Sequence, residues 1–336
     1  MKIALCTTTI NVPHVLKLYR ACDPDVKFFV TGDRNGMHSG AFEYGYISPK
    51  EQEAFRYKCS ELIGWNSIQR RNVAFLEALK WGAEIIVSID DDNAPLCAPY
   101  CAWHQSNLTV QHAGLMANNV NLEDDWFDVG SLLDPPAKHR GLPVGYAPRR
   151  NNFTHVVGAK VGVSAGICLG DPDIDAVTRI AQSPEVHQVS QVLEAGVVNN
   201  PHSWTVFNSQ NTAVLRELVP AWGMIPFVGR MDDIYASLIV QKVMRERGLH
   251  VHFGKPFVWQ SRNDHNLVKD LRGEIDGYEN VARLADLLDH ITLSGKSVLA
   301  DCRRIWETLN HADWMPGRAV MAMSAYLDDC ESLGCK

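Results

Sequence analysis

The stretch that most constrains the fold is EIIVSID at residues 84–90, a nearly uninterrupted apolar run that ends in an aspartate. A strand has this composition when helices cover both faces of its sheet, as in a parallel α/β sheet. Two more strand-like runs precede it, KIALCTTTI and VKFFVTGD, and the helix-like runs VPHVLKLYRAC and SIQRRNVAFLEALKWG alternate with them. This βαβαβ order predicts a doubly wound α/β sheet.

The rest of the chain is less regular until its last third. Residues 121–160 carry many Pro, Gly, Asp and Asn, which favours loops with short strands. VVGAKVGVSAGICLGDPDIDA is typical of one or two strands that end in the turn GDPD, and HVHFGKPFVW of another strand. Helical patterns return at residues 231–248 and continue alone through 267–332. We therefore expect an α/β domain over residues 1–265 and a C-terminal helical extension over 266–336.

Composition excludes some functions and locations. The 336 residues are 46% hydrophobic and carry a net charge of −7 with no long basic run, which argues against a nucleic-acid binder. The short apolar start is a poor signal peptide, and no run approaches a membrane span, so we expect a cytoplasmic protein without membrane contact. Nine scattered cysteines fit free thiols in a reducing compartment. Cys97 and Cys101 have helical spacing, but a zinc site would need two more ligands, which favours inert thiols.

Three aspartates, Asp90, Asp91 and Asp92, follow the third strand directly. Ligands of open α/β sheets bind at the carboxyl ends of the strands, and alternate residues of an extended chain share a side. Asp90 and Asp92 can therefore converge on a divalent cation such as Mg²⁺ or Mn²⁺, which accepts oxygen ligands and keeps positions open for phosphate. The alternative is an acidic turn that caps the next helix. The apolar strand before the aspartates and an Asn-Ala-Pro turn after them favour the metal.

A second acidic pair, Asp232 and Asp233 in GRMDDIYAS, opens the helical run at residues 231–248. Such a pair commonly serves as an N-cap in a favourable interaction with the helix dipole. The alternative is a carboxylate near an acceptor, where it acts as a general base or a polar anchor. Spacing alone favours the cap.

Basic residues near these carboxylates are further candidates. Arg70 and Arg71 precede the third strand, where they would neutralise phosphate, pair with the aspartates or lie on a solvated helix face. Arg149 and Arg150 lie in a loop that suits a bidentate sugar or phosphate contact. His265 follows the end of a strand, although a lone histidine is more often an ordinary surface or core residue.

Taken together, VSIDDDNAP, GRMDDIYASLIVQKVMRERGLHVHFGKPFVWQS and the tail from NLVKDLRGEIDGYENVARLADLL onward resemble the plant reversibly glycosylated polypeptides, a family that includes the UDP-arabinopyranose mutases. The segments match in order along nearly the whole chain. The resemblance implies a glycosyltransferase A-type (Rossmann-like) fold with a mixed sheet, a UDP-sugar donor and a divalent metal, Mn²⁺ or Mg²⁺. It also makes a homo-oligomer plausible.

The resemblance also assigns roles to residues. It implies that Asp90, Asp91 and Asp92 form the metal and donor motif, and it shifts the interpretation of Asp232 and Asp233 to the functional one. Arg149 or Arg150 is the nearest match to the arginine that carries sugar in the plant proteins, although the surrounding residues differ. The family's Trp-His-Ser is Trp-Gln-Ser here, so His265 would substitute as a ligand. The implied donor pocket comprises Thr7, Thr8, Thr9, Asp33 and Arg71.

These observations predict a metal-dependent glycosyltransferase that moves sugar from a UDP donor to an acceptor. The expected acceptor is a small molecule, with a modified nucleic acid as the alternative. Three other functions stay open. The first is a UDP-sugar pyranose/furanose mutase with self-glycosylation, and the second is an inactive nucleotide-sugar-binding scaffold. The third is a nucleotidyltransferase, which no Gly-rich phosphate loop supports.

Overall fold

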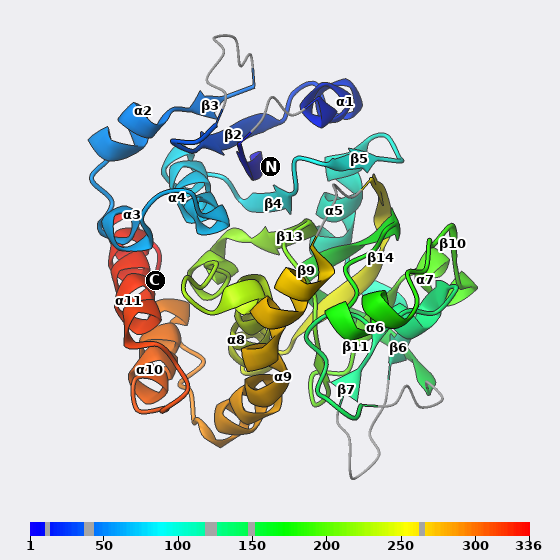
Figure 1. Cartoon of the computed structure of the whole chain (residues 1–336). Coiled ribbons are helices and arrows are strands. Elements are labelled where there is room, and N and C mark those ends of the chain that lie inside the picture. Colours follow the sequence, from blue (N-terminus) through cyan, green and yellow to red (C-terminus); the bar gives the residue numbers. More distant parts are fainter. Residues whose placement is uncertain (11–13, 37–43, 118–125, 147–151, 262–265) are drawn as a thin grey trace.

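The computed structural model describes residues 1–10, 14–36, 44–117, 126–146, 152–261 and 266–336. A single large mixed sheet crosses this part of the chain, with helices on both sides (Figure 1). In spatial order its strands are β3 (Tyr46–Ile47), β2 (Lys27–Gly32), β1 (Ile3–Thr9), β4 (Ile85–Ile89), β13 (Asn211–Leu215), β9 (Phe153–Gly170), β6 (His112–Ala117), β11 (Val197–Asn199), β14 (Leu249–Gln260) and β5 (Asn93–Pro95). The predicted α/β class with a mixed sheet flanked by helices is confirmed.

Shorter elements complete the description. Two small pairs of strands lie outside the large sheet. β7 (Trp126–Phe127) is parallel to β12 (Trp204–Thr205), and β8 (Leu133–Asp134) is antiparallel to β10 (Gln188–Val189). The 3₁₀ helices are η1 (Ile68–Arg70), η2 (Val129–Leu132), η3 (Arg216–Ala221) and η4 (Gly229–Met231). The α-helices are α1 (Val15–Cys22), α2 (Pro49–Ala54), α3 (Lys58–Ile63), α4 (Arg71–Trp81), α5 (Tyr100–Thr109), α6 (Ala176–Ala181), α7 (Gln191–Ala195), α8 (Asp232–Arg245), α9 (Leu267–His290), α10 (Val298–Leu309) and α11 (Gly317–Ser332).

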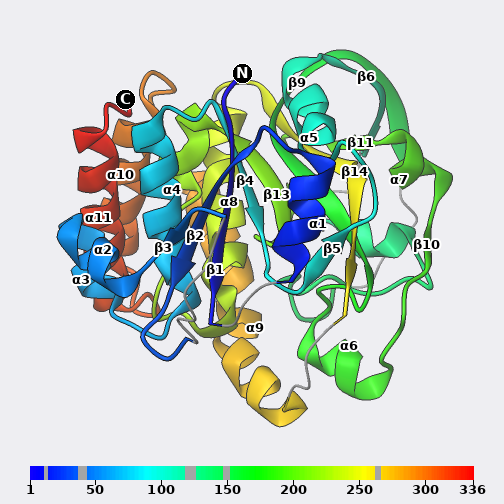
Figure 2. The ribbon, with the colours of Figure 1, turned by 90° about the horizontal axis from the view of Figure 1, so that it is seen from above.

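The apolar strands that define the fold are buried on both faces. Strands β2, β1 and β4 are parallel neighbours, as the βαβαβ order predicts. Along β1, Leu5 packs into a core with α1 and α5, whereas Cys6 packs into the other core with α4 and α8. Figure 2 shows α1 and α4 on different sides of these strands. Because alternate side chains enter different cores, apolar residues occupy consecutive positions of such a strand.

One expectation about local structure was wrong. Residues 93–95, Asn-Ala-Pro, form the edge strand β5 and not a turn, since they pair antiparallel with the end of β14. The short strands expected within residues 121–160 include β7 and β8, and the strand expected before the GDPD turn is one strand, β9, which runs continuously from Phe153 to Gly170. Partner strands on both sides hold this long strand extended despite its four glycines.

The C-terminal helices pack on the body of the molecule. Asp329 of α11 accepts hydrogen bonds from the backbone N–H groups of Lys58 and Cys59, at 3.0 and 2.9 Å, and so satisfies the start of α3. The phenol of Tyr326 donates to the carbonyl of Val219 at 3.2 Å. The helices therefore share a core with the α/β part. The boundary expected after residue 265 adjoins residues 262–265, which lie outside the described part, and it stays a prediction.

Across the described ranges, no helix combines the length and apolar character that crossing a bilayer requires.

Candidate active site

The site lies where the carboxyl ends of three parallel strands meet. In the register of β1 and β2, Thr8 lies beside Thr31 and Thr9 beside Gly32, so both strands end at the same level. Asp33 follows β2 directly, and the three aspartates follow β4. Residues that are far apart in the sequence therefore gather at one edge of the sheet, as the α/β order predicts.

Two adjacent cavities open at this edge. The first, which we call the threonine cavity, has about 610 Å³ of space, and its lining includes Thr8, Thr9, Thr31, Asp33, Ser67 and Asp91. The second, the carboxylate cavity, has about 710 Å³, and its lining includes Asp90, Asp92, Asp173, Asp232, Asp233 and Arg140. Ile68 of η1 lines both cavities, so this 3₁₀ helix separates them. The structure thus places Asp91 on one side and its two neighbours on the other. The extended chain expected for these residues is wrong, because Asp91 and Asp92 form the turn between β4 and β5.

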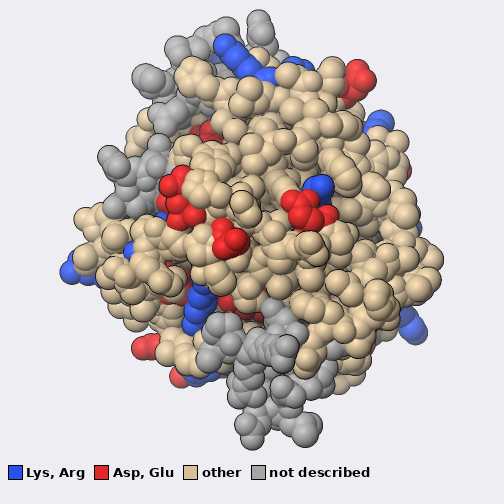
Figure 3. All heavy atoms as spheres, turned by 90° about the vertical axis from the view of Figure 1, so that its right-hand side faces the viewer, with Lys and Arg blue, Asp and Glu red and all other residues tan. Residues whose placement is uncertain are grey.

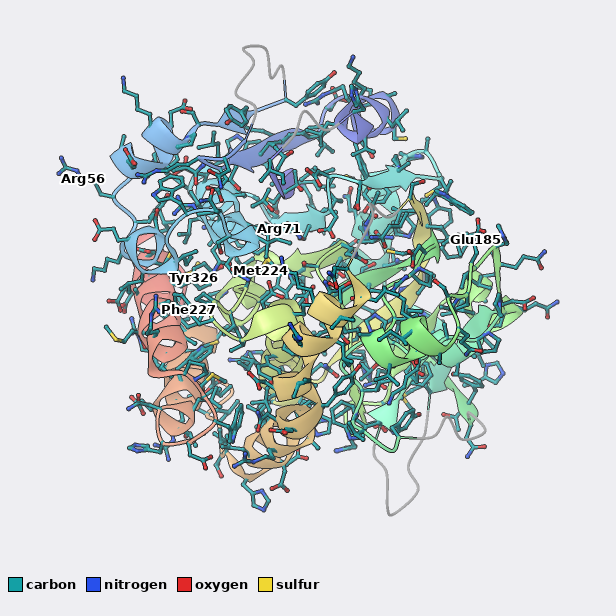
Figure 4. All side chains as sticks on the ribbon, viewed as in Figure 1. Arg56, Arg71, Glu185, Met224, Phe227 and Tyr326 are labelled. Atoms are coloured by element: carbon teal, nitrogen blue, oxygen red, sulfur yellow. The ribbon has the colours of Figure 1, made fainter. Side chains whose placement is uncertain are left out.

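Arg71 pairs with an aspartate. It begins α4, its side chain is 1% exposed, and its Nη2 lies 2.7 Å from Oδ1 of Asp90. Its Nη1 donates to the carbonyl and hydroxyl oxygens of Ser209, at 3.1 and 2.9 Å. Figure 4 shows Arg71 near the middle of the molecule. Of the alternatives for this arginine, the structure contains the ion pair, which fixes the direction of Asp90.

The residues expected to bind a nucleoside are only partly at the cavity surface. Thr8 and Thr9 line the threonine cavity, whereas Thr7 is fully buried. Asp33 lines the cavity too, but its carboxylate already accepts backbone N–H groups. Its Oδ1 accepts from Arg34 and Asn66, both at 2.7 Å, and its Oδ2 from Ser67 at 2.9 Å. Asp33 therefore fixes the loop that leads into η1.

The acidic pair at the start of α8 does not cap the helix. Met231 is the N-cap residue, and no side chain makes a cap hydrogen bond there. Asp233 is instead held from two directions. Its Oδ1 accepts from Arg140 at 3.0 Å, and its Oδ2 accepts from the backbone N–H and hydroxyl of Ser209 at 2.9 and 3.1 Å. The interpretation as an N-cap is therefore wrong for this pair.

Asp232 has a different environment. Its Oδ2 accepts a hydrogen bond of 2.7 Å from Nε2 of Gln69, and the residue is 6% exposed. Burial, and next the neighbouring charge of Asp233, raise the pKa of Asp232 to about 7. A carboxyl group with this pKa can accept or release a proton near neutral pH.

Sequence patterns missed two residues that organise the carboxylate cavity, Arg140 and Asp173. Arg140 is buried, and its Nε and Nη2 donate to Asp173 at 2.9 and 2.7 Å. Its Nη2 also contacts Asp233, and its Nη1 donates to the carbonyl of Arg230. Although burial opposes ionisation of Asp173, the guanidinium beside it holds the pKa of this carboxyl well below its usual range. Asp173 belongs to the GDPD turn, whose position at a strand end was a usable signal, whereas no pattern distinguishes Arg140.

Three predicted residues cannot be placed. Arg149, Arg150 and His265 lie outside the described residues. Gln260, which occupies the position of the family's histidine, is 4% exposed and lines the carboxylate cavity. Within residues that the structure describes, no group of three or more His, Cys, Asp or Glu side chains is arranged to hold a metal ion. This finding covers the described aspartates as well as Cys97 and Cys101.

Comparison with known proteins places this site in context. Residues 230–336 match the family model described as STELLO glycosyltransferases. The chain is also 27% identical over 197 residues to probable UDP-arabinopyranose mutase 1 of Pisum sativum, across 56% of this chain and 50% of that protein. It is distantly related to the UDP-arabinopyranose mutases. UDP-arabinopyranose mutase 1 of Oryza sativa subsp. japonica is 28% identical over the same shares of the two chains. The predicted resemblance to the reversibly glycosylated polypeptides is thus confirmed, at modest identity.

The extent of these similarities is limited. The chain spans about half the length of the mutases that it matches. Among solved structures, the mannosyltransferase PcManGT from Pyrobaculum calidifontis, in complex with GDP-Man and Mn²⁺, aligns with 98% of this chain and 86% of its own. The sequence identity is 13% and the TM-score is 0.36, so this alignment carries no argument about the site.

One face of the molecule carries charges of both signs. In Figure 3 the visible Lys and Arg side chains are scattered singly, at the margins and beside acidic groups, and acidic side chains form small separate groups. Among the described residues of this face, no basic patch suited to a nucleic-acid backbone is visible.

Proposed function

We propose that this chain is an enzyme that binds a UDP-sugar and transfers the sugar to an acceptor. The observation that carries the proposal is the pair of cavities on either side of η1 and the three aspartates. A nucleotide sugar has a flat nucleoside, a charged diphosphate and a polar sugar in series. The threonine cavity suits the nucleoside, the aspartates at the boundary suit a metal with diphosphate, and the carboxylate cavity suits the sugar hydroxyls.

A divalent ion fits this donor set only when it is shared with the ligand. Asp90 and Asp92 supply hard oxygen ligands on one cavity wall, and Mg²⁺ or Mn²⁺ is commonly held by one or two carboxylates together with substrate phosphates. When bound, the ion would offset the charge that develops on the leaving UDP. Arg71 would keep Asp90 directed at the ion through their 2.7 Å contact.

Asp232 is the residue that we propose as the general base. In transfer, the bond between the anomeric carbon and the diphosphate oxygen breaks, and UDP leaves with the electron pair. The acceptor oxygen or nitrogen forms the new bond to the anomeric carbon, and its proton moves to Asp232. A carboxyl with a pKa near 7 suits that step because it is partly ionised at neutral pH yet basic enough to take the proton. Asp233 cannot serve equally, since Arg140 and Ser209 already occupy its oxygens.

The named relatives favour a second candidate, a UDP-sugar pyranose/furanose mutase. In that reaction the sugar returns to UDP after ring contraction and no external acceptor is needed. An inactive nucleotide-sugar-binding scaffold is the third candidate. The acceptor class and the homo-oligomer remain predictions.

Calorimetric titration with UDP, with and without Mn²⁺, tests the donor site. We expect binding that needs the ion, and we expect Asp92→Ala to abolish the dependence on the ion. Asp91→Ala is the matched control, because its carboxylate lines the other cavity, and this variant should keep the metal dependence. Absence of UDP binding by the wild-type chain in both conditions would refute the proposal.

A panel of UDP-sugars then separates the candidates. Release of UDP identifies transfer to water or to an added acceptor, and interconversion of pyranose and furanose forms identifies the mutase. Metal-dependent binding of every sugar without either product would support the scaffold.

A further inference from the structure

Residues 66–69 form a link between the two cavities. The backbone N–H groups of Asn66 and Ser67 both donate to Asp33, so the start of this segment is fixed at the threonine cavity. Ile68 lies between the cavities, and Gln69 reaches Asp232 in the carboxylate cavity. Four consecutive residues thus extend from one predicted end of the donor to the proposed base.

A side-chain connection runs along the same segment. The hydroxyl of Ser67 donates to Oε1 of Gln69, and Nε2 of Gln69 donates to Oδ2 of Asp232 at 2.7 Å. The Asp232 carboxylate determines the orientation of the amide, because an amide rotated by 180° would bring its oxygen against the carboxylate. The Ser67 hydroxyl donates to the amide oxygen on the other side and so holds Gln69 where its N–H meets Asp232, which favours the ionised form of Asp232.

We propose that Gln69 is a positioning residue that aims the Asp232 carboxylate and connects it, through Ser67, to the nucleoside end of the donor. This inference rests on the proposed function. A nucleoside that contacts Asn66 and Ser67 would fix the position of the segment that carries Gln69. The carboxylate of Asp232, the proposed general base, would then be correctly directed when the UDP-sugar is bound.

Other charged groups around Asp232 also influence its proton binding. Asp233 lies on the same helix, and Arg140 offsets part of its charge through a direct ion pair. Further charged residues line the same cavity: Asp90, Asp92, Asp173 and Arg230. Replacement of Gln69 by an apolar side chain leaves all of these in place, so its effect on proton binding by Asp232 can be separated from theirs.

The test compares the wild-type chain with Gln69→Met and Ser67→Ala. Methionine has a similar length but no donor. UDP affinity is measured by calorimetry with Mn²⁺, and UDP release from UDP-arabinopyranose, UDP-glucose and UDP-galactose is measured across pH.

Loss of the hydrogen-bond donor of Gln69 disfavours ionised Asp232, so we expect the acid limb of the rate profile of Gln69→Met to move up by about one pH unit. Its kcat at pH 7 should fall about fivefold while UDP affinity changes little. Ser67→Ala should shift the limb less, in the same direction.

The possible outcomes are distinct. An acid limb that stays in place in Gln69→Met, with normal UDP binding and wild-type turnover present, would overturn the role of Gln69 and leave the proposed function intact. A parallel loss of UDP affinity and kcat at every pH would also overturn it, because it would indicate a merely structural residue. Absence of UDP binding by the wild-type chain would refute the proposed function, and this inference with it.

Discussion

The two cavities hold their polar groups in opposite ways. In the threonine cavity, the Asp33 carboxylate accepts hydrogen bonds from three backbone N–H groups of the adjoining loops and makes no direct ion pair among the described residues. In the carboxylate cavity, five aspartates share one wall with Arg140 and Arg230, and burial raises the pKa of Asp232. The first arrangement depends on local chain geometry, whereas the second depends on charges brought together by the tertiary fold.

This difference predicts how strongly a substitution in each cavity will affect the stability of the protein. A change in the threonine cavity alters a loop and should have a modest effect on stability. A change in the carboxylate cavity uncovers a buried charge, which is costly because the surrounding protein solvates it poorly. Burial also gives Asp232 a pKa at which it can accept a proton near neutral pH. The residue proposed for catalysis therefore lies among those whose replacement should cost the most stability.

Arg140→Met should give the largest effect on stability. Its guanidinium is the shared partner of Asp173 and Asp233, whose side chains are only 3% and 6% exposed. Removal of the guanidinium leaves the buried carboxylates of Asp173 and Asp233 without their cationic partner. We expect a loss of about 3–5 kcal/mol in the free energy of unfolding. Urea denaturation monitored by tryptophan fluorescence measures the loss.

Arg230→Met is the matched control for Arg140→Met. Its side chain is 27% exposed, more than that of Arg140, and pairs with Asp270 and the buried Glu274. We expect a smaller loss than for Arg140→Met, because water already screens part of the interaction. Similar losses for both arginines would show that burial of Arg140 does not make its removal more costly than that of the partly exposed Arg230.

Asp232→Asn should reduce turnover of the UDP-sugar by about 100-fold or more, as expected when a general base is lost. Affinity for UDP with Mn²⁺ should stay within a few-fold of wild type, because Asp232 lies in the other cavity from the predicted nucleoside site. Steady-state rates and calorimetry on the same preparation measure both effects. Retention of wild-type turnover by Asp232→Asn would remove this residue from the mechanism.

Stability should depend on pH through the same carboxyl. The folded-state pKa of Asp232 is raised to about 7, above its value of about 3.9 in unfolded chains. Its contribution to stability is therefore present below pH 4 and is lost as pH rises through 7. Asp232→Asn does not ionise. Its free energy of unfolding relative to wild type should thus increase between pH 5 and 7, by up to about 1.4 kcal/mol per pH unit. A constant difference across this range would mean that Asp232 ionises normally.

Sequence patterns predicted the parts of the site that follow from strand order. Asp90–Asp92 directly follow a strand that is recognisable by its apolar run, and parallel strands end at one edge of a sheet. Asp33 also follows a strand directly, although only the family resemblance implied a role for it. These features are local, so one sequence is enough to predict them.

The remaining features depend on contacts between distant segments. Arg140 contacts Asp173 and Asp233 across 33 and 93 residues of sequence, and Gln69 contacts Asp232 across 163. The acidic pair at the start of α8 looked like a helix cap because its distant partners, Ser209 and Arg140, are invisible to a local pattern. The Asn-Ala-Pro segment looked like a turn for the same reason, since its strand pairing with β14 is also long-range.

Asp33→Asn changes the residue that anchors the loop of the threonine cavity and should have the smallest effect on stability. Asparagine keeps one acceptor oxygen, which can still accept from Arg34 and Asn66, but the amide nitrogen that replaces Oδ2 cannot accept from Ser67. We expect a loss of about 1 kcal/mol in the free energy of unfolding, typical of one hydrogen bond. Thr31→Val, in the same cavity, is the control that keeps the Asp33 hydrogen bonds and removes those of the Thr31 hydroxyl to the carbonyls of Thr7 and Arg70. If Asp33→Asn were as destabilising as Arg140→Met, the carboxylate charge itself would be needed in the threonine cavity, and local geometry would not account for this half of the site.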